Sequence, residues 1–459
     1  MSFPTSTTIL IVGAGPTGLA TALSLIHYGC RDFVIVDAVL QGENTSRAIV
    51  IHAATLEALD IIGCGHELVE SGFKAHSVSI CTPTAELVRG NITYLQKYTP
   101  HPYVLFVPQI STEQILGEKL RQLGVHVYRP KKVAFLKRNS QDPSITDVAF
   151  DDGSVLEAKY VIGADGARST VRAAAGIGFA DPDGEVAADH NLAQMVLADI
   201  TFKGADNSNG MLNIVLSPDN IFLCLPLPAS SNKTLARHGE DITGRVFRVV
   251  CGVPLREGAP PSSPSKEYLQ ILVNRFGQTK MSSDPSVNPN PVEIDQVLWS
   301  TRFRTHSAIA DRTFARLGPD EDEESTQTAK EGGILFLIGD AAHIHSPAGG
   351  QGMNLGIRDA VFLGEAITKH IQMSASPTPG ADVDAILRDF AATRHQRALE
   401  VIRYTKDILN VGGAKYDTRL FGFLPISPAT VRDWVAWTLG KIPFVQERIV
   451  WQLSGLGRR

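Results

Sequence analysis

Three glycines early in the chain, Gly13, Gly15 and Gly18, have the spacing of a turn that binds a dinucleotide. An apolar run precedes them and a helical pattern follows. In such a strand–turn–helix unit the glycines permit a tight turn and close approach of the backbone to a pyrophosphate, which the helix N-terminus attracts. Asp37 ends the next apolar run, where a carboxylate can accept hydrogen bonds from a ribose. The pattern predicts a site for FAD or NAD; a purely structural turn is the alternative.

Two later segments place acidic residues and glycines directly after apolar runs. In VIGADGARSTVR, Asp165 and Gly166 form the turn and Arg168 follows. In LIGDAAHIHSPAGGQGMNLG, Asp340 ends the run, and a glycine-bearing loop that begins at Pro347 leads into a helix. A carboxylate at a strand end can hold ribityl hydroxyls, and backbone N–H groups of such a loop can approach a flat ring that develops negative charge. Together the two segments indicate the second half of a long dinucleotide site.

The elements that must position these residues alternate between strands and helices at the start of the chain. Apolar runs at 9–12 and 33–36 flank a helical pattern at 16–28, an order typical of a parallel sheet with helices on its faces. From about 190 to 305, short apolar runs separated by turn residues predict a β-rich insert. We therefore expect an α/β fold: a Rossmann-like dinucleotide-binding domain, an inserted β-sheet domain and a helical C-terminal region.

The expected boundaries follow these changes of pattern. Residues 1–180 form the first part of the dinucleotide-binding domain and 181–305 the β-rich domain. Residues 306–370 form the second part of the dinucleotide-binding domain, with the GD motif, and 371–459 the helical region. A prior of about 150 residues per domain is compatible with this division.

Composition argues against several classes of protein. The 459 residues include 43 Lys and Arg and 48 Asp and Glu, a formal net charge of −5, without a basic block; we expect no nucleic-acid partner. The five cysteines stand singly, which favours a reducing compartment over a disulfide framework. His343 and His345 lack a third ligand nearby, so no metal is expected. No apolar run is long enough for a membrane span, and a cytoplasmic location is expected.

The three segments together resemble the single-component (class A) FAD-dependent aromatic monooxygenases. The resemblance implies that the Rossmann-like dinucleotide-binding domain is an FAD-binding domain and that the β-rich domain at 181–305 is the substrate domain. In that family GxGxxG, DG and GD motifs occur in this order, matched here by the turn at 13–18, Asp165-Gly166 and Gly339-Asp340. WSTRFRTHSAIADR, before the GD strand, resembles the phenol-hydroxylase-like branch. The chain departs from that branch at Ala54 and Ser307, where arginine is usual, and is expected to lack its C-terminal thioredoxin-like domain.

The resemblance implies how FAD would be held at its nucleotide end. Gly13, Gly15 and Gly18 would cradle the pyrophosphate, and Asp37 would hold the adenosine ribose. The ribityl–pyrophosphate part would be contacted by Arg47, Gln109 and Asp340.

The resemblance also implies residues near the flavin ring. Asp165 belongs to the DG motif, and Arg168 would position FAD or an incoming nicotinamide cofactor. The isoalloxazine would be lined by a loop and the helix start that follows it: Pro347, Gly349, Gly350, Met353 and Asn354. No catalytic side chain is assigned, because in this family the cofactor carries the chemistry.

The activity implied by the resemblance proceeds in two halves. NADPH or NADH reduces FAD, and the reduced flavin captures O₂ as a C4a-hydroperoxide. One oxygen atom then enters an electron-rich aromatic, a phenolic or indole-type secondary metabolite, by hydroxylation or epoxidation. An FAD-dependent dehydrogenase or reductase that does not activate O₂, and a non-catalytic FAD-binding protein, are the alternatives. We expect a monomer or homodimer.

Overall fold

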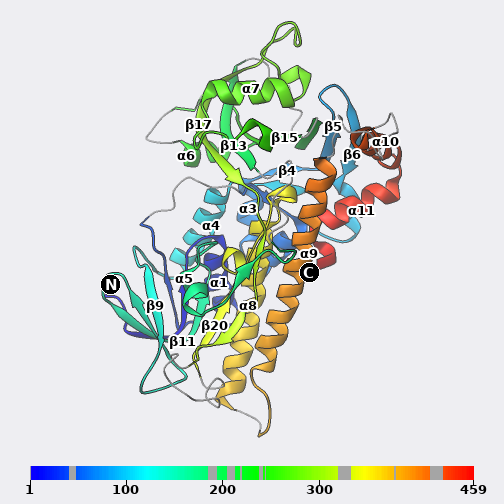
Figure 1. Cartoon of the computed structure of the whole chain (residues 1–459). Coiled ribbons are helices and arrows are strands. Elements are labelled where there is room, and N and C mark those ends of the chain that lie inside the picture. The colour runs from blue at the N-terminus through cyan, green and yellow to red at the C-terminus, as the bar shows by residue number, and fades with distance from the viewer. Residues whose placement is uncertain are drawn as a thin grey trace.

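The computed structural model describes residues 2–40, 48–184, 194–203, 212–217, 220–236, 241–242, 244–318, 332–376, 379–413 and 427–458. Figure 1 shows two large sheet regions, a lower one that contains the start of the chain and an upper one. Long helices from the second half of the chain run beside the lower region and reach toward the upper one.

The lower sheet has eight strands, and its central strands are parallel. They are β1 (Ser6–Val12), β2 (Phe33–Val36), β8 (Val127–Tyr128), β9 (Val133–Arg138), β10 (Thr146–Phe150), β11 (Val155–Gly163), β19 (Phe314–Arg316) and β20 (Ile334–Leu337). The order β19-β20-β11-β1-β2-β8 places β1 between its sequence neighbour β2 and the distant β11. Ile9 and Ile11 of β1 are buried on one face, and Leu10 and Val12 on the other. Burial of both faces explains the continuous apolar run of this strand.

Two helices pack closely against each other beside this sheet, α1 (Pro16–His27) and α8 (Gly352–Ala375). A Cβ on Gly364 would lie 2.2 Å from Ser24 Oγ. Ser24 Oγ itself donates a hydrogen bond to the Val361 carbonyl at 2.5 Å. The small residues Ser24 and Gly364 therefore let α8 pack directly against α1. Helices α2 (Ala53–Ile61), α3 (Gly65–Ser71), α4 (Gln109–Gln122) and α5 (Thr170–Ala174) complete this region.

The upper sheet has seven strands in the order β17-β13-β16-β15-β14-β5-β6. They are β5 (Ser77–Cys81), β6 (Glu86–Asn91), β13 (Gln194–Lys203), β14 (Leu212–Ser217), β15 (Asn220–Pro226), β16 (Val246–Gly252) and β17 (Glu293–Arg304). The β-rich insert expected after residue 190 is thus present. However, β5 and β6 also belong to this sheet, because β5 pairs in parallel with β14. Both strands come from residues 1–180, the segment assigned to the FAD-binding domain.

A helix that the pattern of short strands did not predict, α7 (Lys266–Phe276), covers one face of the upper sheet. The Ser265 side chain caps it by accepting a hydrogen bond from the Tyr268 N–H at 3.3 Å. Its buried residues, Leu269, Leu272, Val273 and Phe276, have helical spacing. That spacing was a usable signal within the insert.

The C-terminal region is helical, with α9 (Ala385–Gly412), α10 (Pro428–Leu439), α11 (Pro443–Ser454) and the 3₁₀ turn η9 (Leu456–Arg458). In Figure 1, α11 lies beside β6, and it also packs on the 3₁₀ turn η1 (Ile92–Lys97). Two small sheets join the parts: β3 (Val50–Ile51) with β7 (Val104–Phe106) and β4 (Phe73–Ala75), and β12 (Phe179–Ala180) with β18 (Ala308–Ala310) and β21 (His343–Ile344).

The remaining short elements are α6 (Asn232–Leu235) and 3₁₀ turns at Ala229–Ser231, Leu255–Glu257, Thr279–Met281, Gly339–Ala341 and Ala348–Gly350. Among the residues that are described, no helix is long and apolar enough to cross a membrane.

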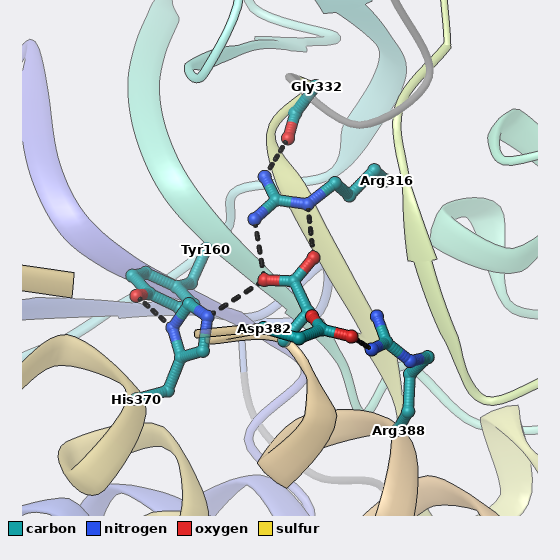
Figure 2. A network of polar contacts seen from close by, with 7 residues as sticks. Tyr160, Arg316, Gly332, His370, Asp382 and Arg388 are labelled. Carbon is teal, nitrogen blue, oxygen red and sulfur yellow. Dashed lines mark hydrogen bonds and ion pairs between the residues drawn. The ribbon is translucent and has the colours of Figure 1, made fainter. Parts of the chain in front are cut away.

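A polar network ties the lower sheet to the two long helices (Figure 2). Tyr160 of β11 contacts His370 Nδ1 of α8 at 2.7 Å, and His370 Nε2 contacts Asp384 at 3.0 Å. Arg316 of β19 donates two hydrogen bonds to Asp384, each 2.7 Å long. Burial raises the pKa of Tyr160 to about 12. Burial alone would also raise the pKa of Asp384, but hydrogen bonds from His370 and Arg316 and their charges place it well below its usual range.

We expect Asp384→Asn to lower the free energy of unfolding at pH 7 by about 1–3 kcal/mol, because charge-assisted hydrogen bonds are lost. The folded pKa lies below the unfolded value of about 3.9. The stabilisation by the Asp384 carboxylate is therefore complete above about pH 3.9, the unfolded pKa, and is lost as the pH falls from there toward the pKa of the folded protein. Urea unfolding at pH 7 and pH 3 measures this difference. Asp382→Asn is the control: its partner Arg388 and Asp382 itself are both exposed, so no measurable change is expected. A pH-independent difference would contradict the assignment.

Candidate functional site

The three glycines of the turn at 13–18 have different surroundings. Gly13 has φ +104°, and a Cβ there would lie 2.3 Å from the Ala164 carbonyl oxygen. A Cβ on Gly18 would lie 1.8 Å from the Gly13 oxygen, whereas a Cβ on Gly15 would meet nothing within 4 Å. Gly13 and Gly18 are therefore required by packing, and Gly15 borders open space. Helix α1 begins there without a side-chain cap or an acidic residue in its first turn.

Asp37, at the end of β2, is connected to the glycine turn. Its Oδ2 accepts a hydrogen bond from the Ala14 N–H at 2.7 Å, and its Oδ1 accepts one from the Val39 N–H at 2.9 Å. Arg129 Nη2 lies 3.8 Å from Asp37 Oδ2 and donates to the Ala14 carbonyl at 3.2 Å. The predicted ribose-binding carboxylate thus lies directly beside the predicted pyrophosphate turn.

The DG turn packs against the glycine turn. Asp165 Oδ2 accepts hydrogen bonds from the N–H groups of Thr170 and Val171, at 2.8 and 3.2 Å, and so caps α5. Asp165 Oδ1 is buried without a partner among the described residues. Arg172, which sequence reasoning did not assign to the site, donates to the Ala341 carbonyl at 2.9 Å and thereby links the DG and GD segments. Arg168 is exposed.

The GD segment follows β20. Gly339 has φ +58°, and a Cβ there would lie 2.7 Å from Thr17 Oγ1 in α1. Asp340 comes next, and its side chain is exposed. The three predicted motifs, although far apart in sequence, therefore meet at the carboxyl ends of β1, β11 and β20. In open α/β sheets, ligands bind at this edge.

A buried ionic cluster that the sequence analysis missed supports the GD segment. Asp359 of α8 is 1% exposed and contacts His343 Nε2 at 2.6 Å and Arg394 Nε at 2.7 Å. The Gly339 N–H also donates to Asp359, at 3.4 Å. Burial alone would raise the pKa of Asp359, but the charges and hydrogen bonds of Arg394 and His343 lower it. Asp359 stands among the apolar positions of the helix expected after the GD segment, and this position could have indicated a buried charge.

The loop at 347–351 lies next to β3 and the start of α2. Gly349 and Gly350 have φ +76° and +62°. Asn354 Nδ2 donates to the carbonyls of Gly350 and Val50, at 2.6 and 2.8 Å, and Asn354 Oδ1 accepts from the His52 N–H at 2.8 Å. Asn354 therefore fixes the loop against β3 from a buried position. Pro347 and Met353 are half-buried.

Two histidines beside this loop are neutral near pH 7. Burial lowers the pKa of both His52 and His345 to about 4. His52 Nε2 contacts the Gly349 carbonyl at 2.8 Å, and His345 Nδ1 contacts the Ser346 carbonyl at 2.8 Å. A carbonyl can only accept, so these nitrogens carry the protons. The opposite nitrogens, His52 Nδ1 and His345 Nε2, are buried acceptors without partners among the described residues.

Gln109 lies at the start of α4 and contacts Ala48, which comes shortly before β3. Its N–H donates to the Ala48 carbonyl at 2.9 Å, and its Nε2 donates to Glu113 at 2.9 Å. Burial raises the pKa of Glu113. Arg47, the other residue expected near the ribityl chain, lies outside the described residues.

A family model described as "FAD binding domain" matches residues 6–405. Rifampicin monooxygenase of Streptomyces venezuelae is 30% identical over 403 residues, which cover 87% of this chain and 70% of that protein. The chain belongs to the family of FAD-dependent aromatic monooxygenases.

Other similar proteins in the comparison are monooxygenases too. The 12-dehydrotetracycline 5-monooxygenase/anhydrotetracycline 6-monooxygenase of Streptomyces rimosus is 28% identical over 408 residues, 87% of this chain and 68% of that protein. The crystal structure of p-nitrophenol 4-monooxygenase from Pseudomonas putida shares the fold, with a TM-score of 0.73, 21% identity and 99% of both chains covered.

The surroundings of the glycine turn fit the FAD that this family binds. Open space at Gly15 and the uncapped start of α1 provide backbone approach and free N–H groups for a pyrophosphate. Asp37 lies beside the turn, and Asp340 follows β20 at the same edge of the sheet. In this monooxygenase the turn would hold the pyrophosphate, and the loop at 347–351 would lie along the flavin ring.

The upper sheet presents an apolar face to that loop. Met195, Leu197, Leu216, Ile221 and Trp299 form a cluster with Leu409 of α9, and Ala348 of the loop packs against it. Alternation along β15 places Phe222 and Cys224 on the opposite face, in the cluster with α7.

One ion pair lies on the face of the upper sheet that is directed toward the loop at 347–351. Arg248 and Asp199 are each 1% exposed and form two hydrogen bonds, of 2.7 and 2.6 Å. The Arg248 guanidinium lies 5.4 Å from the centre of the Trp299 ring. This charged pair therefore lies beside the apolar cluster that contains Trp299.

Proposed function

We propose that this monooxygenase uses NADH or NADPH and O₂ to insert one oxygen atom into an electron-rich aromatic secondary metabolite, phenolic or indole-type, by hydroxylation or epoxidation. The observation that supports this substrate class is the apolar cluster of the upper sheet packed against Ala348. Bulky aromatic rings gain most from such surroundings, because burial of apolar area is favourable.

The residues of the chain would bind and orient the cofactor and keep water away. When bound, FAD supplies hydride acceptance and O₂ activation. The N-terminus of α1 and the glycine turn would bind the pyrophosphate, with Asp37 on the adenosine ribose and Asp340 on the ribityl chain. Gln109 and Arg47 would contact the ribityl–pyrophosphate part, and Arg168 the flavin or the nicotinamide cofactor.

The loop at 347–351 would place backbone N–H groups along the flavin ring, supported by Asn354 and by the Nε2–H of neutral His52. Because His52 carries no charge near pH 7, it adds no positive field at this place. The apolar sheet face would exclude water from the reacting carbon.

The test is reduction of the purified protein by NADH and by NADPH without oxygen, followed by mixing with ¹⁸O₂ and a panel of phenols and indoles. We expect faster flavin reduction with one of the two nucleotides and a product that carries a single ¹⁸O atom. Reoxidation of the flavin without ¹⁸O incorporation, across the whole panel, would instead favour a dehydrogenase.

We also propose that the protein acts in the cytoplasm as a monomer or homodimer. Cell fractionation and light scattering of the purified protein test these two points.

A further inference from the structure

We infer that the end of the chain, residues 453–458, holds the loop at 347–351 in place, and that Gln351 and Arg358 are the positioning residues that join the two segments. The inference rests on the proposed position of this loop beside the flavin. It adds a part of the chain that lies beyond the family match, which ends at residue 405.

Gln351 joins the loop to α11 through a single amide group. Its Nε2 donates to the Gly349 carbonyl at 3.2 Å and to the Leu453 carbonyl at 3.1 Å. The side chain is 1% exposed. Because buried polar groups need partners, displacement of residue 453 would leave this amide short of an acceptor.

Arg358 makes a second connection, about two turns along α8 from Gln351. Its Nη1 donates to the carbonyls of Gly455 and Arg458, at 3.3 and 3.0 Å, and its Nε donates to the Asn354 carbonyl at 3.3 Å. Burial, with the nearby charge of Arg394, lowers the pKa of Arg358 to about 9, so the side chain is still a cation at pH 7. Its partners are thus carbonyls of the C-terminal segment and of the residue that holds the loop.

Apolar contacts close the same junction. Leu456 is 3% exposed and belongs to a cluster with Ile49, Ala53 and Ala54, which lie around β3 and the start of α2. The Arg458 guanidinium lies 5.2 Å from the centre of the Tyr404 ring. The C-terminal segment therefore packs against the region around β3 and the start of α2, which Asn354 also contacts.

The loop itself has little that would order it alone. It contains two glycines with positive φ, and its Gly350 N–H donates to the Pro347 carbonyl at 2.9 Å. A segment that is not held by its neighbours must lose conformational entropy when it binds a ligand. Release of the C-terminal segment should therefore weaken FAD binding without touching an FAD-contacting residue.

The test compares Gly455→Ala with Gly124→Ala. Gly455 has φ +75°, and a Cβ there would lie 3.2 Å from Arg358 Nη1 and 3.5 Å from the Ala54 Cβ. Gly124 follows helix α4, has φ +78°, and a Cβ there would meet nothing within 4 Å. Both substitutions carry the same backbone cost, but only Gly455→Ala strains the junction.

Hydrogen exchange of the FAD-free proteins and the Kd for FAD are the readouts. In Gly455→Ala we expect faster exchange at 453–458 and also at 347–354, and about tenfold weaker FAD binding. In Gly124→Ala both should match the wild type. Faster exchange at 453–458 with unchanged exchange at 347–354 and an unchanged Kd would overturn the inference.

A second variant covers the case in which Gly455→Ala does not fold. Gln351→Met keeps the length of the side chain and removes its N–H donor. Because the hydrogen bond to the Leu453 carbonyl is lost, hydrogen exchange at 453–458 should become faster. Unchanged exchange there would equally overturn the inference. A wild-type protein that binds no FAD would instead contradict the proposed function.

Discussion

Gly15→Val is expected to weaken FAD binding severely while the FAD-free protein keeps its stability. A Cβ at this position meets nothing within 4 Å, and the backbone is extended, with φ −76° and ψ −175°. Valine is therefore compatible with the fold, but its methyl groups would fill the space through which a pyrophosphate approaches the backbone. We expect the Kd for FAD to rise by about 1,000-fold, roughly 4 kcal/mol. Fluorescence titration with FAD and thermal unfolding of the FAD-free protein measure the two effects.

Gly18→Ala is the informative comparison for this variant. Its Cβ would lie 1.8 Å from the Gly13 carbonyl oxygen, so the FAD-free protein itself should be destabilised. If Gly15→Val bound FAD normally, the turn would not be the pyrophosphate site. If both variants lost stability equally, Gly15 would serve packing alone.

Asp340→Ala is also expected to yield protein without FAD. Asp340 follows β20 at the edge where β1, β11 and β20 end, and its side chain is exposed. Its removal should cost the FAD-free protein little, because most exposed substitutions change stability by no more than about 0.5 kcal/mol. The ribityl oxygens would lose a charged acceptor, so FAD should be lost during purification. The ratio of absorbance at the flavin band to that of the protein measures occupancy.

Asp340→Asn serves as the matched control, since it keeps the shape and one acceptor oxygen. We expect partial FAD occupancy, between the wild type and Asp340→Ala. A yellow, fully loaded Asp340→Ala protein would show that this carboxylate does not hold the cofactor.

The parts of the fold that the sequence predicted are those encoded locally. The turn at 13–18 and the strands and helix around it follow from the spacing of a few neighbouring residues, and all three elements are present. The DG and GD turns could be located because each follows an apolar strand. That these turns meet at one edge agrees with a general property of parallel sheets, in which the carboxyl ends of the strands lie together.

Other contacts depend on partners that no local pattern reveals. The pairing of β5 with β14 joins residues 77–81 to the insert, so a boundary drawn from composition could not separate the two regions. Asp359 contacts His343 and Arg394 across three different elements, and each could have been a surface charge. Pairing of buried charges is a property of the assembled core.

The order of the lower sheet has a consequence for how the protein is made. On the ribosome, β1, α1 and β2 emerge first, but β11 and β20, which complete the central part of the sheet, follow much later, and α8 emerges after them. Until then the buried apolar residues of β1, Ile9 to Val12, lack most of their cover, and the edge that would receive FAD is incomplete. Nascent chains in this condition are prone to aggregate. FAD can therefore stabilise the protein only near the end of its synthesis.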